Sequence, residues 1–327
     1  MSPNLKNPAA AKAAVAKPVA WLVVACLLIV YIVWGTTYFA IKVAIEGIAP
    51  FFLVGTRFAV AGVLLLGWQA LRGAPAPTAK QWAGAALVGL LLLVIGNGAV
   101  SVAEHWVSSG ATVALISIMP LATALWSGAF GQWPRRAEWV AIALGGAGAA
   151  IMLLGRDLQG SILGTLLILF GTASWSLGTV LSRRLDIPHG PTGFGAEMLT
   201  AGLMGLVISA VLGEHWSIPS APHVWWAWGY LVVFGSLIAF SAYRFVVERV
   251  SPSLAATYAY VNPAVGLGVG WWLGNESFSL NVLLGLPVVL GAVALHAWIQ
   301  TRAAPLAAHK VPLGPAPCLP SQVRGKP

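Results

Sequence analysis

The stretch that decides the predicted fold is WAGAALVGLLLLVIGNGAVSVAEHWVS, residues 82–108. Its apolar part is about 20 residues long, the length that an α-helix needs to cross the hydrocarbon core of a bilayer. A second stretch, WWAWGYLVVFGSLIAFSAYRFVVERVS at residues 225–251, follows about 143 residues later. It has the same Trp at its start and the same Val-Ser pair at its end. The same step places Pro120 opposite Pro263 and Gly131 opposite Gly274. We therefore predict two related halves, each made of apolar helices.

The composition agrees with a membrane location. The chain has 58% hydrophobic and 8% charged residues, and its mean hydropathy is +0.84, whereas a soluble domain has about 25% charged residues. A soluble core of this size could not cover so many apolar side chains, so we predict an all-α polytopic membrane protein whose main surroundings are the lipid bilayer. The formal charge of +9 comes from cations between apolar runs, a pattern that indicates membrane orientation and argues against nucleic-acid binding.

The cysteines and the N-terminus add little. Cys26 lies inside an apolar run and Cys318 near the C-terminus, so neither a disulfide nor a metal site is expected. The apolar run from Trp21 continues past Trp34, which is too long for the core of a signal peptide. We interpret it as a first span that is retained.

Applying the length rule along the chain predicts ten spans. They lie near 20–43, 50–71, 82–103, 109–131, 138–154, 161–182, 191–212, 224–247, 253–273 and 280–301. The flanking residues 1–19 and 302–327 are rich in Ala, Pro and Lys, and we expect them to be disordered cytoplasmic tails.

The loop charges predict the orientation. If both ends lie on one side, most Lys and Arg residues fall on that side, while Glu46, Glu104, Glu214 and Glu276 fall on the other. This bias places both termini in the cytoplasm of a multi-pass inner-membrane protein. Because five spans is an odd number, the halves 20–154 and 161–301 would be inserted in opposite directions. Inverted repeats of this kind are typical of secondary transporters that work by alternating access. A passive channel or a scaffold without transport remains the alternative.

Several motifs resemble one known family. WGTTYFAIKVAIE from Trp34, with Pro50 and Arg57, and VSPSLAATYAYVNP from Val250 to Pro263 resemble the EamA family of the drug/metabolite transporter superfamily. GNGAVSVAEH from Gly96 and AEML from Ala196 are similar to its YedA-like branch. The resemblance covers about residues 20–300, so each half resembles one EamA repeat.

This resemblance implies ten helices with cytoplasmic termini and a central cavity bounded by helices 1, 3, 4, 6, 8 and 9. It also implies export or exchange of small metabolites, amino acids or drug-like molecules. One departure matters: family members often have a Gly-Glu pair after helix 4 as well as after helix 9. Here Gly131-Gln132-Trp133 stands opposite Gly274-Asn275-Glu276, so the two halves are less symmetric than their pattern suggests.

Arg57 and Glu197 lie well inside predicted spans, where burying a charge is costly. Arg57 could contact Glu46, Glu104, backbone carbonyls or an anionic substrate. Glu197 could bind and release protons in a transport cycle, or it could be a buried partner for Arg244. We favour pairing with Arg244 over proton coupling. Lys42 and Glu46 have the spacing of an ion pair within one helix.

Further cavity candidates are polar or aromatic residues on spans expected to face the interior. Asn97 lies between two glycines, and Asn262 precedes Pro263. Pro120 and Pro263 mark predicted helix breaks in corresponding spans, which point to a binding region or to simple packing kinks. The aromatic and hydroxyl candidates, which could hold an amphipathic substrate, are Trp34, Thr37, Tyr38, Trp175, Tyr243 and Tyr258.

No pattern favours catalysis. The six histidines are scattered, without Glu-x-x-His or His-x-x-x-His spacing, and no phosphate-binding loop precedes a helix. We expect no enzyme activity, catalytic residue, metal or cofactor, and a monomer or homodimer that binds a small-molecule substrate.

Overall fold

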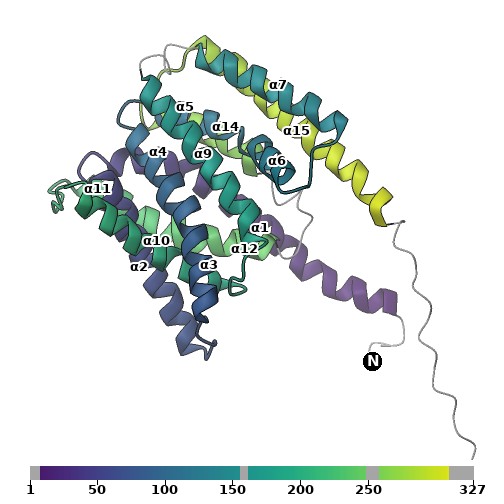
Figure 1. Cartoon of the computed structure of the whole chain (residues 1–327), viewed down its shortest axis with the longest axis horizontal. Coiled ribbons are helices and arrows are strands. Elements are labelled where there is room, and N and C mark those ends of the chain that lie inside the picture. The colour runs from purple at the N-terminus through teal and green to yellow at the C-terminus, as the bar shows by residue number, and fades with distance from the viewer. Residues whose placement is uncertain (1–7, 155–160, 248–257, 309–327) are drawn as a thin grey trace, which may run out of the picture.

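The computed structural model describes residues 8–154, 161–247 and 258–308 (Figure 1). Within these ranges the chain is helical and contains no strand. Seven helices there are long and apolar enough to cross a membrane: Trp21–Ala44, Pro50–Leu71, Ala79–Ala103, Ser109–Ala129, Ile162–Ser182, Pro191–Val211 and Pro222–Tyr243. Leu280–His296 is a shorter apolar helix. The all-helical, multi-pass membrane class predicted from composition is therefore confirmed, whereas the count of ten spans stays a prediction.

The helices follow one another in an order that divides at the loop after Leu153. The first part contains α1 (Pro8–Ala44), α2 (Pro50–Leu71), α3 (Ala79–Gly89), η1 (Leu90–Gly96), α4 (Asn97–Ala103), α5 (Ser109–Ile116), α6 (Met119–Ala129) and α7 (Arg136–Leu153). The second part contains α9 (Ile162–Ser182), α10 (Pro191–Val211), α11 (Pro222–Tyr230), η2 (Leu231–Ile238), α12 (Ala239–Val247), α14 (Tyr258–Trp272) and α15 (Leu280–Ala308).

Local sequence explains where several helices begin. The Ser108 hydroxyl accepts a hydrogen bond from the backbone N–H of Ala111 at the start of α5, and Ser161 does the same for Gly164 at the start of α9. At α3, the Thr78 hydroxyl and the Gln81 side chain form a capping box. Such caps satisfy backbone donors that a first helical turn leaves free.

Apolar stripes on the outer surface face the surrounding lipid. Along α10, Leu203, Val207 and Val211 are 54%, 62% and 80% exposed and recur at four-residue spacing, which places them on one side of the helix. Leu163, Leu166 and Phe170 form a similar exposed stripe along α9. Such surfaces are unfavourable in water and favourable in a bilayer, so they agree with the membrane class.

Close backbone packing joins α2 to α10. A Cβ atom on Gly202 would lie 2.2 Å from the backbone nitrogen of Ala59, and one on Gly62 would lie 2.4 Å from that of Leu199. Glycine is therefore required for the two backbones to approach so closely. In the same way Gly148 of α7 lies against α15, and Figure 1 shows these two helices side by side at one edge of the bundle.

Two π-helical segments, η1 and η2, interrupt α-helical spans. Their π-helical geometry was not predicted from the sequence. η1 precedes α4 and η2 precedes α12, in stretches that correspond in the two halves of the chain. Each has a polar side chain that donates to a carbonyl five residues earlier: Asn97 Nδ2 to Leu92 O at 3.4 Å, and Ser236 Oγ to Leu231 O at 3.0 Å. A π-turn widens the helix locally, and such turns are frequent at functional sites.

Part of each expected tail is helical: residues 8–19 belong to α1 and residues 302–308 to α15, while residues 1–7 and 309–327 lie outside the described residues. Helix α1 begins at Pro8 and α15 continues to Ala308. The sequence AAAKAAVAK after Pro8 consists mainly of strong helix formers, so the helix extends beyond the apolar span.

The two prolines behave differently from each other. Near Pro120 the chain divides: α5 ends at Ile116, and α6 begins at Met119 with Pro120 in its first turn. By contrast α14 runs through Pro263 without ending, so the helix is not divided there as the chain is near Pro120. Packing of α14 against α1 and α5 holds the helix together, as neighbouring helices do for prolines in other membrane spans.

Candidate functional site

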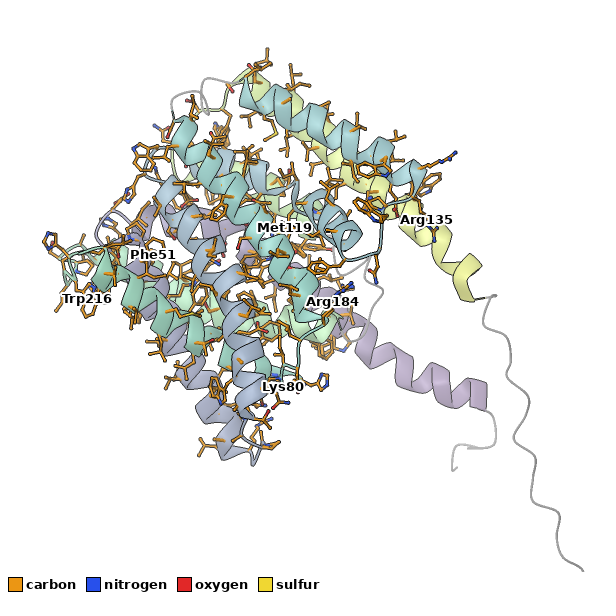
Figure 2. The ribbon with its side chains drawn as sticks, viewed as in Figure 1. Phe51, Lys80, Met119, Arg135, Arg184 and Trp216 are labelled. Atoms are coloured by element: carbon orange, nitrogen blue, oxygen red, sulfur yellow. The ribbon has the colours of Figure 1, made fainter. Side chains whose placement is uncertain are left out.

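A cavity of about 80 Å³ lies inside the bundle, where α1, α2, α4, α5, α9, α12 and α14 converge. A water molecule needs about 10–15 Å³ on this measure, so the space holds several waters or one small solute. Its walls combine aromatic rings, aliphatic side chains and a few polar groups. They are Trp34, Thr37, Tyr38, Ile41, Arg57, Gly96, Asn97, Val100, Val113, Ile116, Ser117, Met119, Gly171, Thr172, Trp175, Phe240, Tyr258, Asn262 and Pro263. Figure 2 shows Met119 near the middle of the bundle.

Eight of the ten predicted substrate-cavity residues lie on these walls. They are Trp34, Thr37, Tyr38, Arg57, Asn97, Trp175, Tyr258 and Asn262. They come from five different spans, so only the tertiary fold brings them together. That any of them contacts a substrate remains a prediction.

Glu197 is not among the residues that line this cavity. It sits on α10 with 7% of its surface exposed, and a Cβ on Gly89 of α3 would lie 2.6 Å from its carbonyl oxygen. α10 packs along α2 and α3, and the Glu197 backbone lies against α3. Glu197 has an interaction partner in the structure. The predicted partner Arg244 has a side chain outside the described set.

Tyr243 is also outside the cavity wall, because it stands behind two residues that form that wall. The Trp34 ring lies 5.0 Å from Tyr243, 5.2 Å from Tyr258 and 5.1 Å from Phe240, measured between ring centroids. Tyr243 and Tyr258 pack edge to face at 5.6 Å. This cluster of four rings gives the cavity one rigid apolar wall, and Tyr243 supports it from the second layer.

Arg57 supplies the cavity with a cation. The side chain is 3% exposed, its Nε donates to the Ser236 hydroxyl at 2.9 Å, and its guanidinium lies 4.7 Å from the Phe58 ring centroid. No carboxylate of the described residues is within ion-pair distance of it. The guanidinium charge therefore faces the cavity without a neutralising partner.

The partners predicted for Arg57 and Lys42 were wrong in part. Glu46 pairs with His223 at 2.9 Å on the exposed surface, so it serves neither Arg57 nor Lys42. Lys42 Nζ donates to the main-chain oxygen of Glu104. The loop after α1 turns Glu46 toward the start of α11, where the imidazole is the nearest basic group.

Carboxylates gather at one end of the bundle, which we call the acidic end: it contains Glu46, Glu104, Glu214 and Glu276. Figure 2 shows Phe51 and Trp216 at this end, while the labelled cations Lys80, Arg135 and Arg184 lie on the other side. This distribution matches the charge separation read from the loops.

Two of these carboxylates cap helices of the other half of the chain. Glu214 accepts from the backbone N–H groups of Phe51 at 3.1 Å and Phe52 at 2.9 Å, at the start of α2. Glu276 accepts from the N–H of Ser109 at 2.9 Å, from its hydroxyl at 2.8 Å and from the N–H of Gly110 at 3.0 Å, at the start of α5. A helix N-terminus favours negative charge, and hydrogen bonds to a charged group are strong. We call these contacts the two carboxylate caps. Sequence reasoning noted the Glu276 asymmetry but did not predict its partner.

The apolar stripes, the membrane-length helices and the polar and aromatic cavity together fit a multi-pass membrane transporter. The chain belongs to the EamA-like transporter family, whose sequence profile matches residues 21–154 and again residues 162–298.

Relatives agree with this assignment. The uncharacterized inner membrane transporter YedA of Escherichia coli strain K12 is 42% identical over 270 residues, covering 82% of this chain and 88% of YedA. The uncharacterized transporter sll0355 of Synechocystis is 28% identical over 294 residues, with 81% and 86% coverage. One crystal structure of a protein, at 19% identity, superimposes with a TM-score of 0.62 over 86% of this chain and 98% of that chain, which supports the fold.

Proposed function

We propose that the protein is a secondary transporter in which two inverted five-helix repeats, residues 20–154 and 161–301, alternate access to the central cavity. The two consecutive family matches support the repeat, and an odd number of spans in each half would invert one relative to the other. The loop charges favour both termini in the cytoplasm, with the acidic end outside. The protein would work in the lipid bilayer as a monomer or homodimer and would export or exchange its substrate.

The observation that carries the proposal is the Arg57 guanidinium, a buried cation on the wall of the cavity without a carboxylate partner among the described residues. A buried charge is costly unless something neutralises it. A substrate with a carboxylate or another anionic group would do so. The ring cluster around Trp34 would then hold the apolar part of the same molecule. Amino acids and other small carboxylates fit this chemistry better than organic cations.

Reconstitution into liposomes tests this function. Purified protein is given a panel of labelled amino acids, small carboxylates and organic cations, and uptake is followed with and without unlabelled substrate inside. A carrier saturates and shows accelerated exchange. A passive channel, the alternative function, gives flux that does not saturate and is not stimulated by internal substrate.

An Arg57→Gln variant tests the substrate class. It should raise the KM for carboxylate substrates at least tenfold, because the charge-assisted contact is worth about 1.5–3 kcal/mol. Arg72→Gln, which changes an exposed Arg at the far end of α2, is the matched control and should leave KM unchanged. Equal loss for neutral analogues would contradict recognition of an anion by Arg57.

A further inference from the structure

Glu104 lies directly after α4 at the acidic end, and its side chain is completely buried. Neither carboxylate oxygen has a hydrogen-bond partner among the described residues. This contrasts with Glu214 and Glu276, whose oxygens all accept from backbone N–H groups. An ionised carboxylate without partners in a dry site is costly, whereas a protonated carboxyl avoids most of that cost.

The surroundings of Glu104 do not neutralise it. The titratable groups near it are Lys42 and Tyr38 of α1, Glu276 beyond α14 and the adjacent His105. Lys42 donates a hydrogen bond to the main-chain oxygen of Glu104, and its ammonium is not within ion-pair distance of the Glu104 carboxylate. α5 and α9, which pack beside this end of α4, carry no titratable side chain, and Arg57 of α2 is bonded to Ser236.

The electrostatic balance at Glu104 follows from this arrangement. Burial raises the pKa of its carboxyl well above the usual range. The Lys42 charge opposes this rise, and the Glu276 charge adds to it. Geometry and electrostatics thus both favour the protonated form of the carboxyl in the packed site.

We propose that Glu104 is a proton-binding site that couples closure of the acidic end to the external pH. The carboxylate takes a proton from external water as this end packs shut, forming the O–H bond of a neutral acid. When the end opens and hydrates, that bond breaks and the proton returns to the same water. This site rests on the proposed function, because it uses the opening step of the transport cycle.

Protonation of Glu104 changes the charge next to two structurally important residues. Its field acts on Glu276, whose carboxylate caps α5, and on Tyr38, which lines the cavity. The charge of Glu104 therefore affects both a helix cap at the acidic end and a residue of the cavity wall. Glu197, considered from sequence as a proton carrier, does not line the cavity and has an interaction partner.

The sign of the pH effect follows from linkage. The closed conformation binds the proton more tightly than the open one, where a hydrated Glu has an ordinary pKa of about 4.3. Below that pH Glu104 is protonated in both conformations, so the closed conformation does not bury an ionised carboxylate. Between that value and the raised pKa of the closed state, each pH unit shifts the equilibrium toward the open form by up to about tenfold.

A thiol-accessibility experiment tests the site without a known substrate. Val113, which lines the cavity from α5 and is 2% exposed, is changed to Cys in the full chain after Cys26→Ala and Cys318→Ala. A membrane-impermeant thiol reagent is added outside sealed right-side-out vesicles over a range of pH. Labelling should rise with external pH more steeply than thiol ionisation alone predicts. With Glu104→Gln added, that extra rise should disappear and labelling should stay low.

Controls separate Glu104 from its neighbours. Glu46→Gln neutralises an exposed acid at the same end and should leave the pH profile unchanged. Lys42→Gln removes the cation that stabilises ionised Glu104, so the transition should move to higher pH, and this variant keeps the test decisive if Glu104→Gln does not fold. The same steep profile in Glu104→Gln, or an unmoved transition in Lys42→Gln, overturns the proposal.

The reconstitution assay distinguishes failure of the site from failure of the function. If exchange saturates and its pH profile is the same with and without Glu104→Gln, the proton-binding site is refuted and the transport function stands. A Glu104-dependent profile without flux for any solute in the panel supports proton binding and refutes transport of those solutes.

Discussion

The Nε atom of Arg57 donates to the Ser236 hydroxyl at 2.9 Å, and this contact joins α2 to the π-helical segment η2. Ser236 in turn donates to the Leu231 carbonyl at 3.0 Å. The cation of the cavity wall is therefore oriented by the irregular part of the second half. The width of η2 sets where the hydroxyl stands, so backbone geometry and the placement of the charge depend on each other.

Ser236→Ala should destabilise the protein by about 1.5–3 kcal/mol, because it leaves a buried charged donor without its acceptor. Thermal unfolding in detergent measures the change. Ser127→Ala is the control: its hydroxyl bonds only to the Thr123 carbonyl of its own helix, so its loss should cost less. Equal shifts for the two variants would show that Ser236 does not hold Arg57.

Gly202→Ala should prevent the close contact of α10 with α2, since the added Cβ would lie 2.2 Å from the Ala59 nitrogen. We expect a loss of several kcal/mol, as for other overpacked contacts between rigid backbones, visible as poor yield of folded protein on size-exclusion chromatography. Gly67→Ala on α2, where nothing lies within 4 Å, should be neutral or slightly stabilising. A well-folded Gly202→Ala protein would mean that the helices separate at little cost.

Glu276→Gln should loosen the acidic end by removing the charge that caps α5. The cap is worth about 0.5–2 kcal/mol, so external labelling of a cysteine at position 113 should rise a few-fold at fixed pH. This is the opposite direction from Glu104→Gln. Unchanged labelling would show that the Glu276 cap serves folding and not closure.

Glu197→Gln should lower the unfolding temperature without changing the pH dependence of transport. The residue is buried on α10 and has an interaction partner, and it does not line the cavity. The comparison of pH-gradient-driven accumulation in wild type and variant decides this point. Loss of accumulation with an unchanged unfolding temperature would restore Glu197 as a coupling group.

Much of the cavity could be predicted from residue type and span membership. Arg57, Asn97 and Trp175 were candidates because polar groups are costly inside an apolar span and aromatic groups can hold a substrate. The structure places all three on the wall of one cavity. Glu197 met the same criterion but does not line the cavity. Apolar and small residues occur on all sides of α10, so the sequence pattern could not tell which side of that helix faces the cavity.

The sequence by itself determined the class of the protein, its helical content and the approximate ends of its helices. It could do so because a span in lipid must satisfy its backbone hydrogen bonds within its own residues. Only the tertiary structure decided that Ser236 holds Arg57, that Glu276 caps α5 and that the buried Glu104 carboxylate has no hydrogen-bond partner among the described residues. Each of these depends on how helices distant in sequence pack together, and that packing is set by contacts among many side chains that no local pattern records.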